Sequence, residues 1–203
     1  MGEAQENLKL MLLELDEMTK EVANNNNGVH LHMGCGKNIL KGFLNIDKYF
    51  EHRYVLQLDM YQTPFSNESI EGIYSSHSLE HLSIRKAQLA LAHWAWLLKP
   101  GGKLYLAVPD LEEICRLMIS DEVSEDEKWD WYLYTLFGYQ TDCSIPDSDK
   151  NLNHPDDLGQ YHTTGFTEKR LAKLLRDNGL KIERQYKYDG WRTPSIWTVA
   201  VKL

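Results

Sequence analysis

Short apolar runs alternate with amphipathic segments along most of this chain. An apolar run of roughly four to eight residues between turn residues predicts a strand that is buried on both faces. Such runs occur at residues 29–33, 43–46, 55–58, 70–75, 103–108 and 195–201, and a further strand is expected at residues 180–188. Their alternation with helical segments predicts a doubly wound α/β fold, in which helices cover both faces of a mostly parallel seven-stranded sheet.

Helical spacing of apolar residues predicts the helices between these strands. A helix is expected over residues 3–23, with a stripe formed by Leu8, Leu12, Leu15, Met18 and Val22. A second is expected over residues 84–98, with Leu89, Ala92, Trp96 and Leu97 on its apolar side. The sequence KPGG at residues 99–102 ends it, because proline and glycine interrupt helices.

Two further helices are expected, at residues 111–119 and 167–178. Thr167 is the candidate N-cap of the second, and Gly179 follows its end. Only the short sequence YDGWRTP separates the last two strands, so they are predicted to pair as a hairpin. This pairing places one antiparallel strand in the sheet near the C-terminus.

Composition narrows the class of protein. The 203 residues predict a single domain over residues 1–203, and the net charge of −8 disfavours nucleic acid as a partner. No apolar run reaches the roughly 18 residues of a membrane helix. Cys35, Cys115 and Cys143 lack the CxxC spacing of zinc sites, which indicates free thiols and predicts a cytoplasmic protein.

A glycine turn follows the first predicted strand. Gly34 and Gly36 flank Cys35, and Asp47 ends the next strand. Glycines at this place let backbone N–H groups approach a nucleotide-like ligand. The NAD fingerprint fits poorly, because Ile39 stands at its third glycine and Asp47 comes too early. A phosphate-binding loop of the GxxxxGK[ST] type is also missing from the sequence.

Four motifs in order add a family resemblance. LHMGCG with GFLNID, LDMYQTPFSNESIEGIYSSHSLEHL, LLKPGGKLYLAVPD and YHTTGFTEKRLAKLLRDNGLKIE resemble the class I S-adenosylmethionine-dependent methyltransferases. The similarity is greatest to small members associated with glycan biosynthesis. It implies S-adenosyl-L-methionine as cofactor and S-adenosyl-L-homocysteine as product.

The resemblance also implies roles for residues around the turn. Gly34, Cys35 and Gly36 would meet the methionine part of the cofactor, and Asp47 would accept hydrogen bonds from the ribose hydroxyls. The remaining cofactor candidates are Asp59 and Met60 at the adenine, with Ser76 and His77 near the sulfonium. For Cys35 a small turn-filling role is favoured over a reactive thiol. Turn or cap roles are the alternatives for Asp47 and Asp59.

A hydroxyl acceptor usually requires a general base, and histidine suits this role. The candidates are His81, His162 and Asp110. The alternative that none of the three is the base stays open. His154, Asp156 and Asp157 have metal-ligand chemistry but lie in a Pro-rich loop, where solvated acids are commoner. The sequence therefore predicts no metal.

Residues 121–162 interrupt the alternation and are the expected substrate-side insertion. In WDWYLYTLFGYQ, Trp131, Tyr134 and Gly138 share a helical face. Such a face packs on the core or forms an aromatic wall for a sugar or planar acceptor. The residues at 1–24 are expected to form the N-terminal helix, which packs on the domain or serves as a lid or homodimer contact.

These observations predict an enzyme that O-methylates a sugar hydroxyl of a glycan or nucleotide sugar. A methyltransferase acting on a small-molecule metabolite is the first alternative. A cofactor-binding partner subunit without catalysis is the second, and a dehydrogenase is the last.

Overall fold

The computed structural model describes residues 28–138, 161–190 and 193–203. The predicted helix at 3–23 and the candidates Cys143, His154, Asp156 and Asp157 lie outside these residues. None of the helices among the described residues combines the length and apolar content that crossing a membrane requires.

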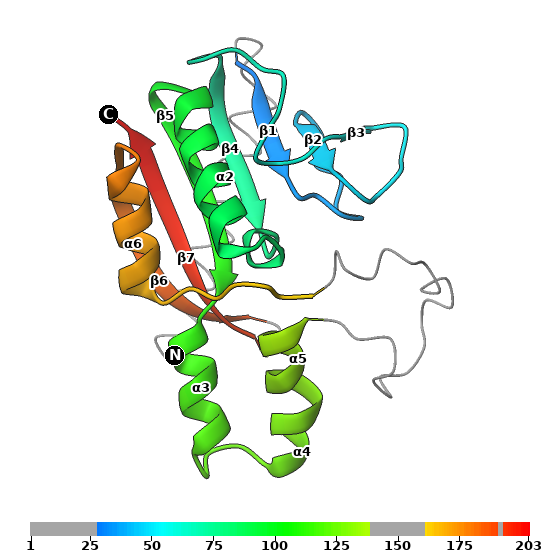
Figure 1. Cartoon of the computed structure of the whole chain (residues 1–203), viewed down its shortest axis with the longest axis vertical. Coiled ribbons are helices and arrows are strands. Elements are labelled where there is room, and N and C mark those ends of the chain that lie inside the picture. The colour runs from blue at the N-terminus through cyan, green and yellow to red at the C-terminus, as the bar shows by residue number, and fades with distance from the viewer. Residues whose placement is uncertain (1–27, 139–160, 191–192) are drawn as a thin grey trace.

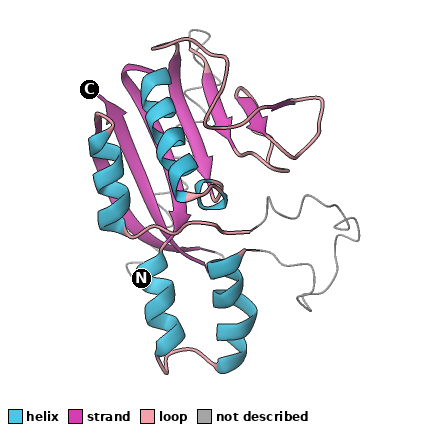
Figure 2. Cartoon of the chain, in the orientation of Figure 1, coloured by secondary structure: helices cyan, strands magenta, loops and turns pink. Residues whose placement is uncertain are grey.

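One seven-stranded sheet forms the centre of the molecule (Figures 1 and 2). Its strands are β1 (His30–Met33), β2 (Leu44–Asp47), β3 (Val55–Gln57), β4 (Ile70–Ser76), β5 (Leu98–Pro109), β6 (Leu180–Gly190) and β7 (Thr193–Lys202). They lie in the order β3-β2-β1-β4-β5-β7-β6. Parallel pairing joins β3 through β5, and β7 pairs antiparallel with both β5 and β6. The predicted fold class and its single antiparallel strand are thus confirmed.

The order of strands creates a switch point between β1 and β4. The chain runs from β1 outward to β3, then crosses back to β4 on the other side of β1. Adjacent loops at the carboxyl ends of β1 and β4 therefore diverge, and a crevice opens between them. Open α/β sheets bind ligands at such a place.

Capping residues mark where the best-predicted helix begins and ends. They are η1 (Leu79–His81), α2 (Ile84–Leu97), α3 (Leu111–Ile119), α4 (Glu125–Glu127), η2 (Lys128–Tyr132), α5 (Leu133–Phe137) and α6 (Glu168–Asp177). Thr167 caps α6 by accepting a hydrogen bond from the N–H of Arg170, and Gly179 adopts φ = 76° just beyond its end. Both features confirm the predicted bounds of this helix.

The main core lies where α2 and α6 pack on one face of the sheet (Figure 1). Trp94 of α2 is completely buried there, together with Leu91 and with Leu171 of α6. The opposite face of the sheet carries a second cluster, which contains Phe43, Tyr105, Ala107, Trp197 and Val199.

Of the four apolar residues expected on α2, only Leu97 is buried. Leu89 and Trp96 are about half exposed, and Ala92 is exposed. The buried side carries Leu97 together with Ala87, Ala90, Leu91, Trp94 and Ala95. Because this helix is apolar over most of its surface, its periodicity does not select one side. The small alanines allow close approach to the sheet, which decides the orientation.

Candidate functional site

The glycine turn after β1 has the conformation that its residues predict. Gly34 and Gly36 have φ angles of 66° and 48°, in the left-handed region. A Cβ on Gly34 would lie 2.3 Å from Cβ of Ser78, whereas a Cβ on Gly36 would meet nothing within 4 Å. Gly34 thus permits the close packing of the turn against Ser78, and Gly36 leaves space above the turn for a ligand.

The Asp47 carboxylate holds this turn in place. Its Oδ2 accepts a hydrogen bond from the N–H of Gly36 at 2.8 Å. Its Oδ1 accepts from the N–H groups of Tyr49 and Phe50 at 2.8 and 2.9 Å. Asp47 is therefore a structural residue of the turn as well as a residue of the cavity described next.

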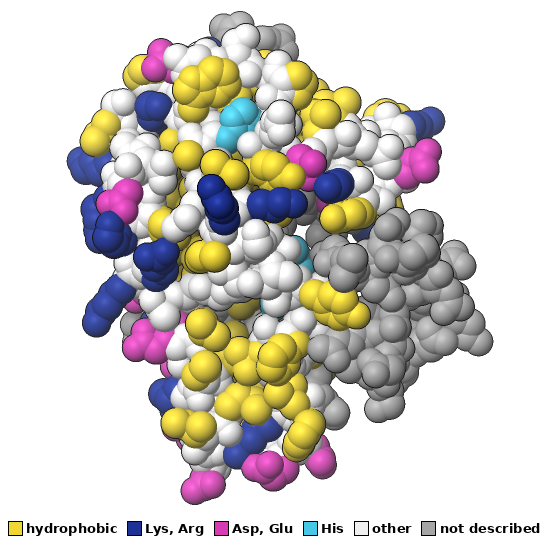
Figure 3. Space-filling model, in the orientation of Figure 1, with side chains coloured by type: hydrophobic (Ala, Val, Ile, Leu, Met, Phe, Trp, Pro, Cys, Tyr) yellow, Lys and Arg dark blue, Asp and Glu magenta, His cyan; other side chains and the backbone are white. Residues whose placement is uncertain are grey.

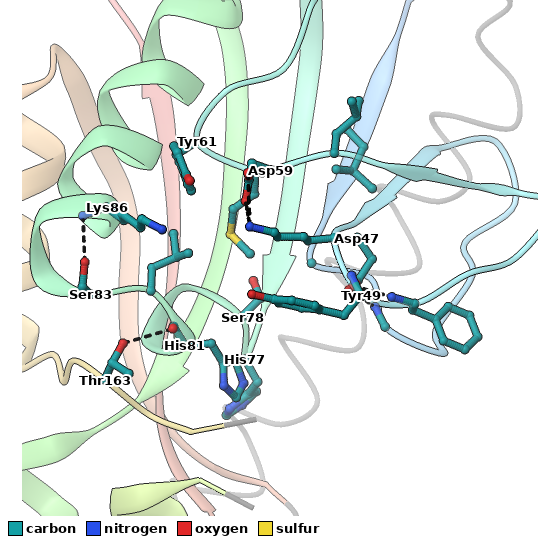
Figure 4. Close-up of a pocket in the computed structure, with 18 of the residues that line it drawn as sticks. Asp47, Tyr49, Asp59, Tyr61, His77, Ser78, His81, Ser83, Lys86 and Thr163 are labelled. Carbon is teal, nitrogen blue, oxygen red and sulfur yellow. Dashed lines mark hydrogen bonds and ion pairs between the residues drawn. The ribbon is translucent and has the colours of Figure 1, made fainter. Parts of the chain in front are cut away.

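A cavity of about 550 Å³, termed here the glycine-turn cavity, opens at the switch point (Figure 4). Its lining includes Gly34, Gly36, Asp47, Asp59, Met60, His77, Ser78, His81, Lys86 and Thr163. Asp59 pairs there with Lys48, whose Nζ lies 3.1 Å from Oδ1. The backbone carbonyl of Met60 accepts a hydrogen bond from Nε1 of Trp94 at 2.7 Å, which ties the cavity wall to the core.

Cys35 and Ser76 do not line the glycine-turn cavity, unlike the other predicted cofactor residues. Both face a flanking cavity of about 680 Å³ beside the turn, which also contacts Tyr74 and His32. Burial raises the pKa of the Cys35 thiol to about 11, so the thiol stays protonated and unreactive near neutral pH. The turn-filling role predicted for Cys35 agrees with this environment.

His77 lies at the junction of the cavities. It follows β4 with φ = 50°, an unusual conformation for a residue with a side chain. Its N–H donates to the carbonyl of Ala107, and its Nε2 lies 3.3 Å from Oγ of Ser195. These contacts anchor His77, at the end of β4, to β5 and to the antiparallel strand β7.

A buried carboxylate lies next to the histidines. The side chain of Glu80 in η1 is only 1% exposed. Its Oε1 lies 3.4 Å from Nδ1 of His77 and 4.0 Å from Nε2 of His162. The rings of His81 and His162 meet edge to face, with their centroids 4.7 Å apart. These residues form the histidine cluster, defined as His77, Glu80, His81 and His162.

A short segment before α6 brings His162 to this cluster from a distant part of the chain. The N–H groups of Thr163 and Thr164 both donate to the carbonyl of Glu80. The N–H of His162 donates to the carbonyl of Phe137, the last residue of α5. The last carbonyls of a helix have no partner within it, so the end of α5 offers acceptors. The segment thereby fastens η1 to α5.

Within the histidine cluster, burial and neighbouring charges shift the pKa values of Glu80 and His162 in opposite directions. Burial raises the pKa of the Glu80 carboxyl, but the neighbouring His77, His81 and His162 outweigh it and hold the pKa below its usual value. Burial lowers the pKa of His162, although the charge of Glu80 opposes that change. Glu80 is thus a carboxylate near neutral pH, beside a neutral His162 ring.

The cluster borders a separate cavity of about 290 Å³, termed here the histidine cavity. Its lining consists of His77, Glu80, His81, Pro109, Tyr134, Thr135, His162 and Thr193. His77 and His81 line both this cavity and the glycine-turn cavity. The two spaces are therefore neighbours that share histidine side chains.

Asp110 occupies a structural position. It caps α3, with Oδ1 accepting from the N–H groups of Glu112 and Glu113, and its Oδ2 lies 2.9 Å from Nζ of Lys187. It lines none of the three cavities described above. These contacts explain its complete burial without a role as a base.

The described part of the predicted insertion is helical. The segments α4, η2 and α5 continue one another from residue 125 to 137 and lie beside α3 (Figure 1). Tyr134 reaches the histidine cavity. Hydrophobic side chains gather on the surface over these helices, where Ile119, Trp129 and Phe137 are exposed (Figure 3). The aromatic residues of this segment are therefore partly packed and partly exposed. Only Tyr134 among those named reaches a cavity.

Comparison with known proteins finds a family match over part of the chain. Residues 31–106 match the sequence profile of the family described as a methyltransferase domain. This part of the chain is thus similar to a methyltransferase domain. S-adenosylmethionine is the cofactor of this domain family, and the matched residues contain the glycine turn, Asp47, Asp59 and the histidines at 77 and 81.

Proteins of known structure, two of them methyltransferases, share the fold of this chain. A protein from Pyrococcus horikoshii is 15% identical with a TM-score of 0.60, covering 99% of this chain and 93% of its own. The magnesium protoporphyrin IX methyltransferase of Synechocystis with bound S-adenosylhomocysteine is 15% identical with a TM-score of 0.58, covering 100% and 89%. The 1,6-didemethyltoxoflavin N1-methyltransferase of Burkholderia thailandensis is 14% identical with a TM-score of 0.55, covering 100% and 91%. The search of curated proteins found no relative of significant similarity.

The sequence motifs of the methyltransferase domain missed two features of the site. The first is the burial of Glu80, which an acidic residue in LEH does not signal. The second is a set of polar residues in the lining of the glycine-turn cavity, namely Ser78, Lys86 and Thr163. These three residues lie in loops or in the first turn of a helix. Their positions therefore follow no periodic pattern in the sequence.

Proposed function

We propose that this chain transfers the methyl group of S-adenosylmethionine to a hydroxyl group of a carbohydrate, either a glycan or a nucleotide sugar. The observation that carries the proposal is the pair of neighbouring cavities that share His77 and His81. The cofactor occupies the glycine-turn cavity, and the acceptor enters the histidine cavity. The resemblance of the motifs to glycan-associated methyltransferases supports the carbohydrate acceptor.

In this proposal the glycine turn and the two aspartates bind the cofactor. The free space above Gly36 takes the methionine part, and Asp47 accepts hydrogen bonds from the ribose hydroxyls. Asp59 exchanges part of its pairing with Lys48 for the exocyclic amine of adenine, while Met60 packs on the ring. Ser76 stays beside the turn in the flanking cavity, and His77 lies toward the sulfonium.

The histidine cluster removes the proton of the acceptor hydroxyl. As the hydroxyl oxygen attacks the methyl carbon, the carbon–sulfur bond breaks and S-adenosylhomocysteine leaves. His81 is the base assigned here, because it lines both cavities and its ring meets that of His162, and Glu80 stabilises the imidazolium that forms. His162 positions Glu80 and His81 from the acceptor side. Alignment of the reactants and exclusion of water supply the rest of the rate.

Calorimetry with Asp47→Ala tests the cofactor site. The wild-type chain is expected to bind S-adenosylmethionine and S-adenosylhomocysteine but not NAD. Asp47→Ala is expected to weaken this binding at least tenfold, or roughly 1.4 kcal/mol, because charge-assisted hydrogen bonds to the ribose are lost. Glu51→Ala is the matched control, since Glu51 is exposed and outside the cavity lining. Tight NAD binding without S-adenosylmethionine binding would overturn the proposal.

Product analysis tests the reaction. Incubation with a panel of glycans and nucleotide sugars is expected to give a product that mass spectrometry shows to be heavier by one methyl group. His81→Ala is expected to lower turnover roughly 100-fold or more, in the range of general base catalysis, while cofactor affinity stays the same. Full turnover by His81→Ala and His162→Ala would remove both histidines from the chemistry. Methylation of a nitrogen or carbon atom would refute the hydroxyl acceptor.

A further inference from the structure

The histidine cluster has the composition of a metal site. We propose that Glu80, His81 and His162 bind a divalent transition-metal ion at the border of the histidine cavity. Among the described residues, one ligand atom from each of the three lies within 4.8 Å of the others. The use of the ion in catalysis rests on the proposed function, whereas its binding does not.

The buried carboxylate needs a positive partner. Neither oxygen of Glu80 accepts a hydrogen bond from the described residues, and both oxygens are buried. The nearest ring nitrogen, Nδ1 of His77, is 3.4 Å away, which exceeds the usual hydrogen-bond range of about 2.7–3.2 Å. A buried carboxylate without donors is costly, so native proteins pair it with a cation or a metal. Its oxygens are thus aimed into the cluster with free lone pairs.

Each of the two histidines keeps one ring nitrogen that can coordinate an ion. Nδ1 of His162 lies 2.6 Å from the carbonyl oxygen of Thr135, and Nδ1 of His81 lies 3.2 Å from that of Tyr161. A carbonyl oxygen only accepts, so each Nδ1 carries the hydrogen and each Nε2 is left with its lone pair. Metal-binding histidines are commonly oriented in this way by a backbone carbonyl.

Ligand chemistry selects the class of ion. Two imidazoles and one carboxylate suit first-row transition metals such as Zn²⁺, whereas Mg²⁺ and Ca²⁺ prefer oxygen ligands alone. On a tetrahedral ion with bonds of about 2.0–2.1 Å, neighbouring ligand atoms lie about 3.3 Å apart. Ligand atoms that lie up to 4.8 Å apart therefore draw together by up to about 1.5 Å when they close on the ion.

The position next to the cavity gives the ion a use. Three protein ligands leave one coordination position open, which is the arrangement of catalytic rather than structural zinc sites. An acceptor hydroxyl bound there would lose its proton to water more readily, and the ion would hold the resulting alkoxide for attack on the methyl carbon. With the ion bound, His81 serves as a ligand and the metal replaces it as the activating group.

Titration of the chelator-treated full-length chain with Zn²⁺ alone tests the site. Calorimetry is expected to show one tight site, which Glu80→Gln and His162→Gln each weaken at least tenfold. Glu80→Gln keeps the shape of the buried side chain, and circular dichroism and thermal melting verify that it folds. His52→Gln is the matched control, because His52 is exposed and outside all three cavities. Co²⁺ as a second probe is expected to give visible absorption bands that Glu80→Gln removes.

The outcomes separate this site from the proposed function. Absence of a tight Zn²⁺ site in a folded chain overturns the metal site and leaves cofactor binding untouched. Equal Zn²⁺ affinity in wild type and in both folded variants would also overturn it, because the ion would then sit elsewhere. Zn²⁺ binding that depends on Glu80, in a chain that fails to bind S-adenosylmethionine, supports the metal site and refutes the proposed function.

Discussion

At the scale of single residues, buried polar groups hold the site in shape. Asn45 shows this most clearly, because its side chain bonds to the backbone of Leu40 in both directions, and its Oδ1 also lies 3.1 Å from Nδ1 of His32. Since that oxygen only accepts, His32 donates from Nδ1, while its burial disfavours the charged form of the ring. A buried histidine thus lies among the side chains under the glycine turn.

Stability is expected to fall on mild acidification because of His32. Burial lowers its pKa to about 4, although the bond to Asn45 and the charge of Asp47 oppose this. The unfolded chain takes up the proton below about pH 6.5, whereas the folded chain resists until about pH 4. The contribution is therefore complete above pH 6.5 and is lost as the pH falls from 6.5 to 4, by about 1.4 kcal/mol per pH unit.

Urea unfolding at pH 7 and pH 4.5 measures this effect. Wild type is expected to lose about 2.5 kcal/mol more than His32→Gln between these values, because glutamine has no proton to take up. His52→Gln, at an exposed histidine, is expected to behave as wild type. Parallel losses in wild type and His32→Gln would contradict the assignment.

At the scale of elements, capping fixes where the helices begin, while packing decides which side they bury. Ser83, Asp110 and Thr167 each accept hydrogen bonds from the first turn of the helix that follows. These caps use only neighbouring residues, so the bounds of α3 and α6 follow from the sequence. The buried side of α2 instead depends on which of its apolar sides fits the sheet.

Thr167→Ala tests the cap of α6. Loss of the bond to the N–H of Arg170 is expected to lower the free energy of unfolding by about 1 kcal/mol. Lys169→Ala, on an exposed position of the same helix, is expected to change it by less than about 0.5 kcal/mol. Denaturant unfolding compares the two, and an equal effect of both would mean that the cap adds nothing.

At the scale of the whole molecule, the site is formed by several segments that the fold brings together, and no single element contains it. The glycine-turn cavity combines residues that follow β1, β2, β3 and β4 with Thr163 from the distant segment before α6. A ligand that fills this cavity contacts parts of the chain that separate on unfolding. Its binding energy therefore adds to the stability of the complete fold.

Thermal melting is expected to show this linkage. S-adenosylmethionine at 100 times its dissociation constant is expected to stabilise the chain by about 2.7 kcal/mol and to raise Tm accordingly. NAD at the same concentration serves as the control and is expected to leave Tm unchanged. An equal increase with both compounds would show that the effect is not specific to the glycine-turn cavity.

The sequence alone determined the sheet, the glycine turn and the position of Asp47, because strand patterns, turn chemistry and caps act over a few neighbouring residues. The tertiary structure alone decided that Asp110 is buried beside Lys187, which side of α2 is buried, and that Glu80 meets His162. The last contact joins residues 82 positions apart in the printed sequence and forms only when the segment before α6 bonds to both η1 and α5. Long-range packing of this kind leaves no local pattern, so the histidine cluster became visible only in the folded chain.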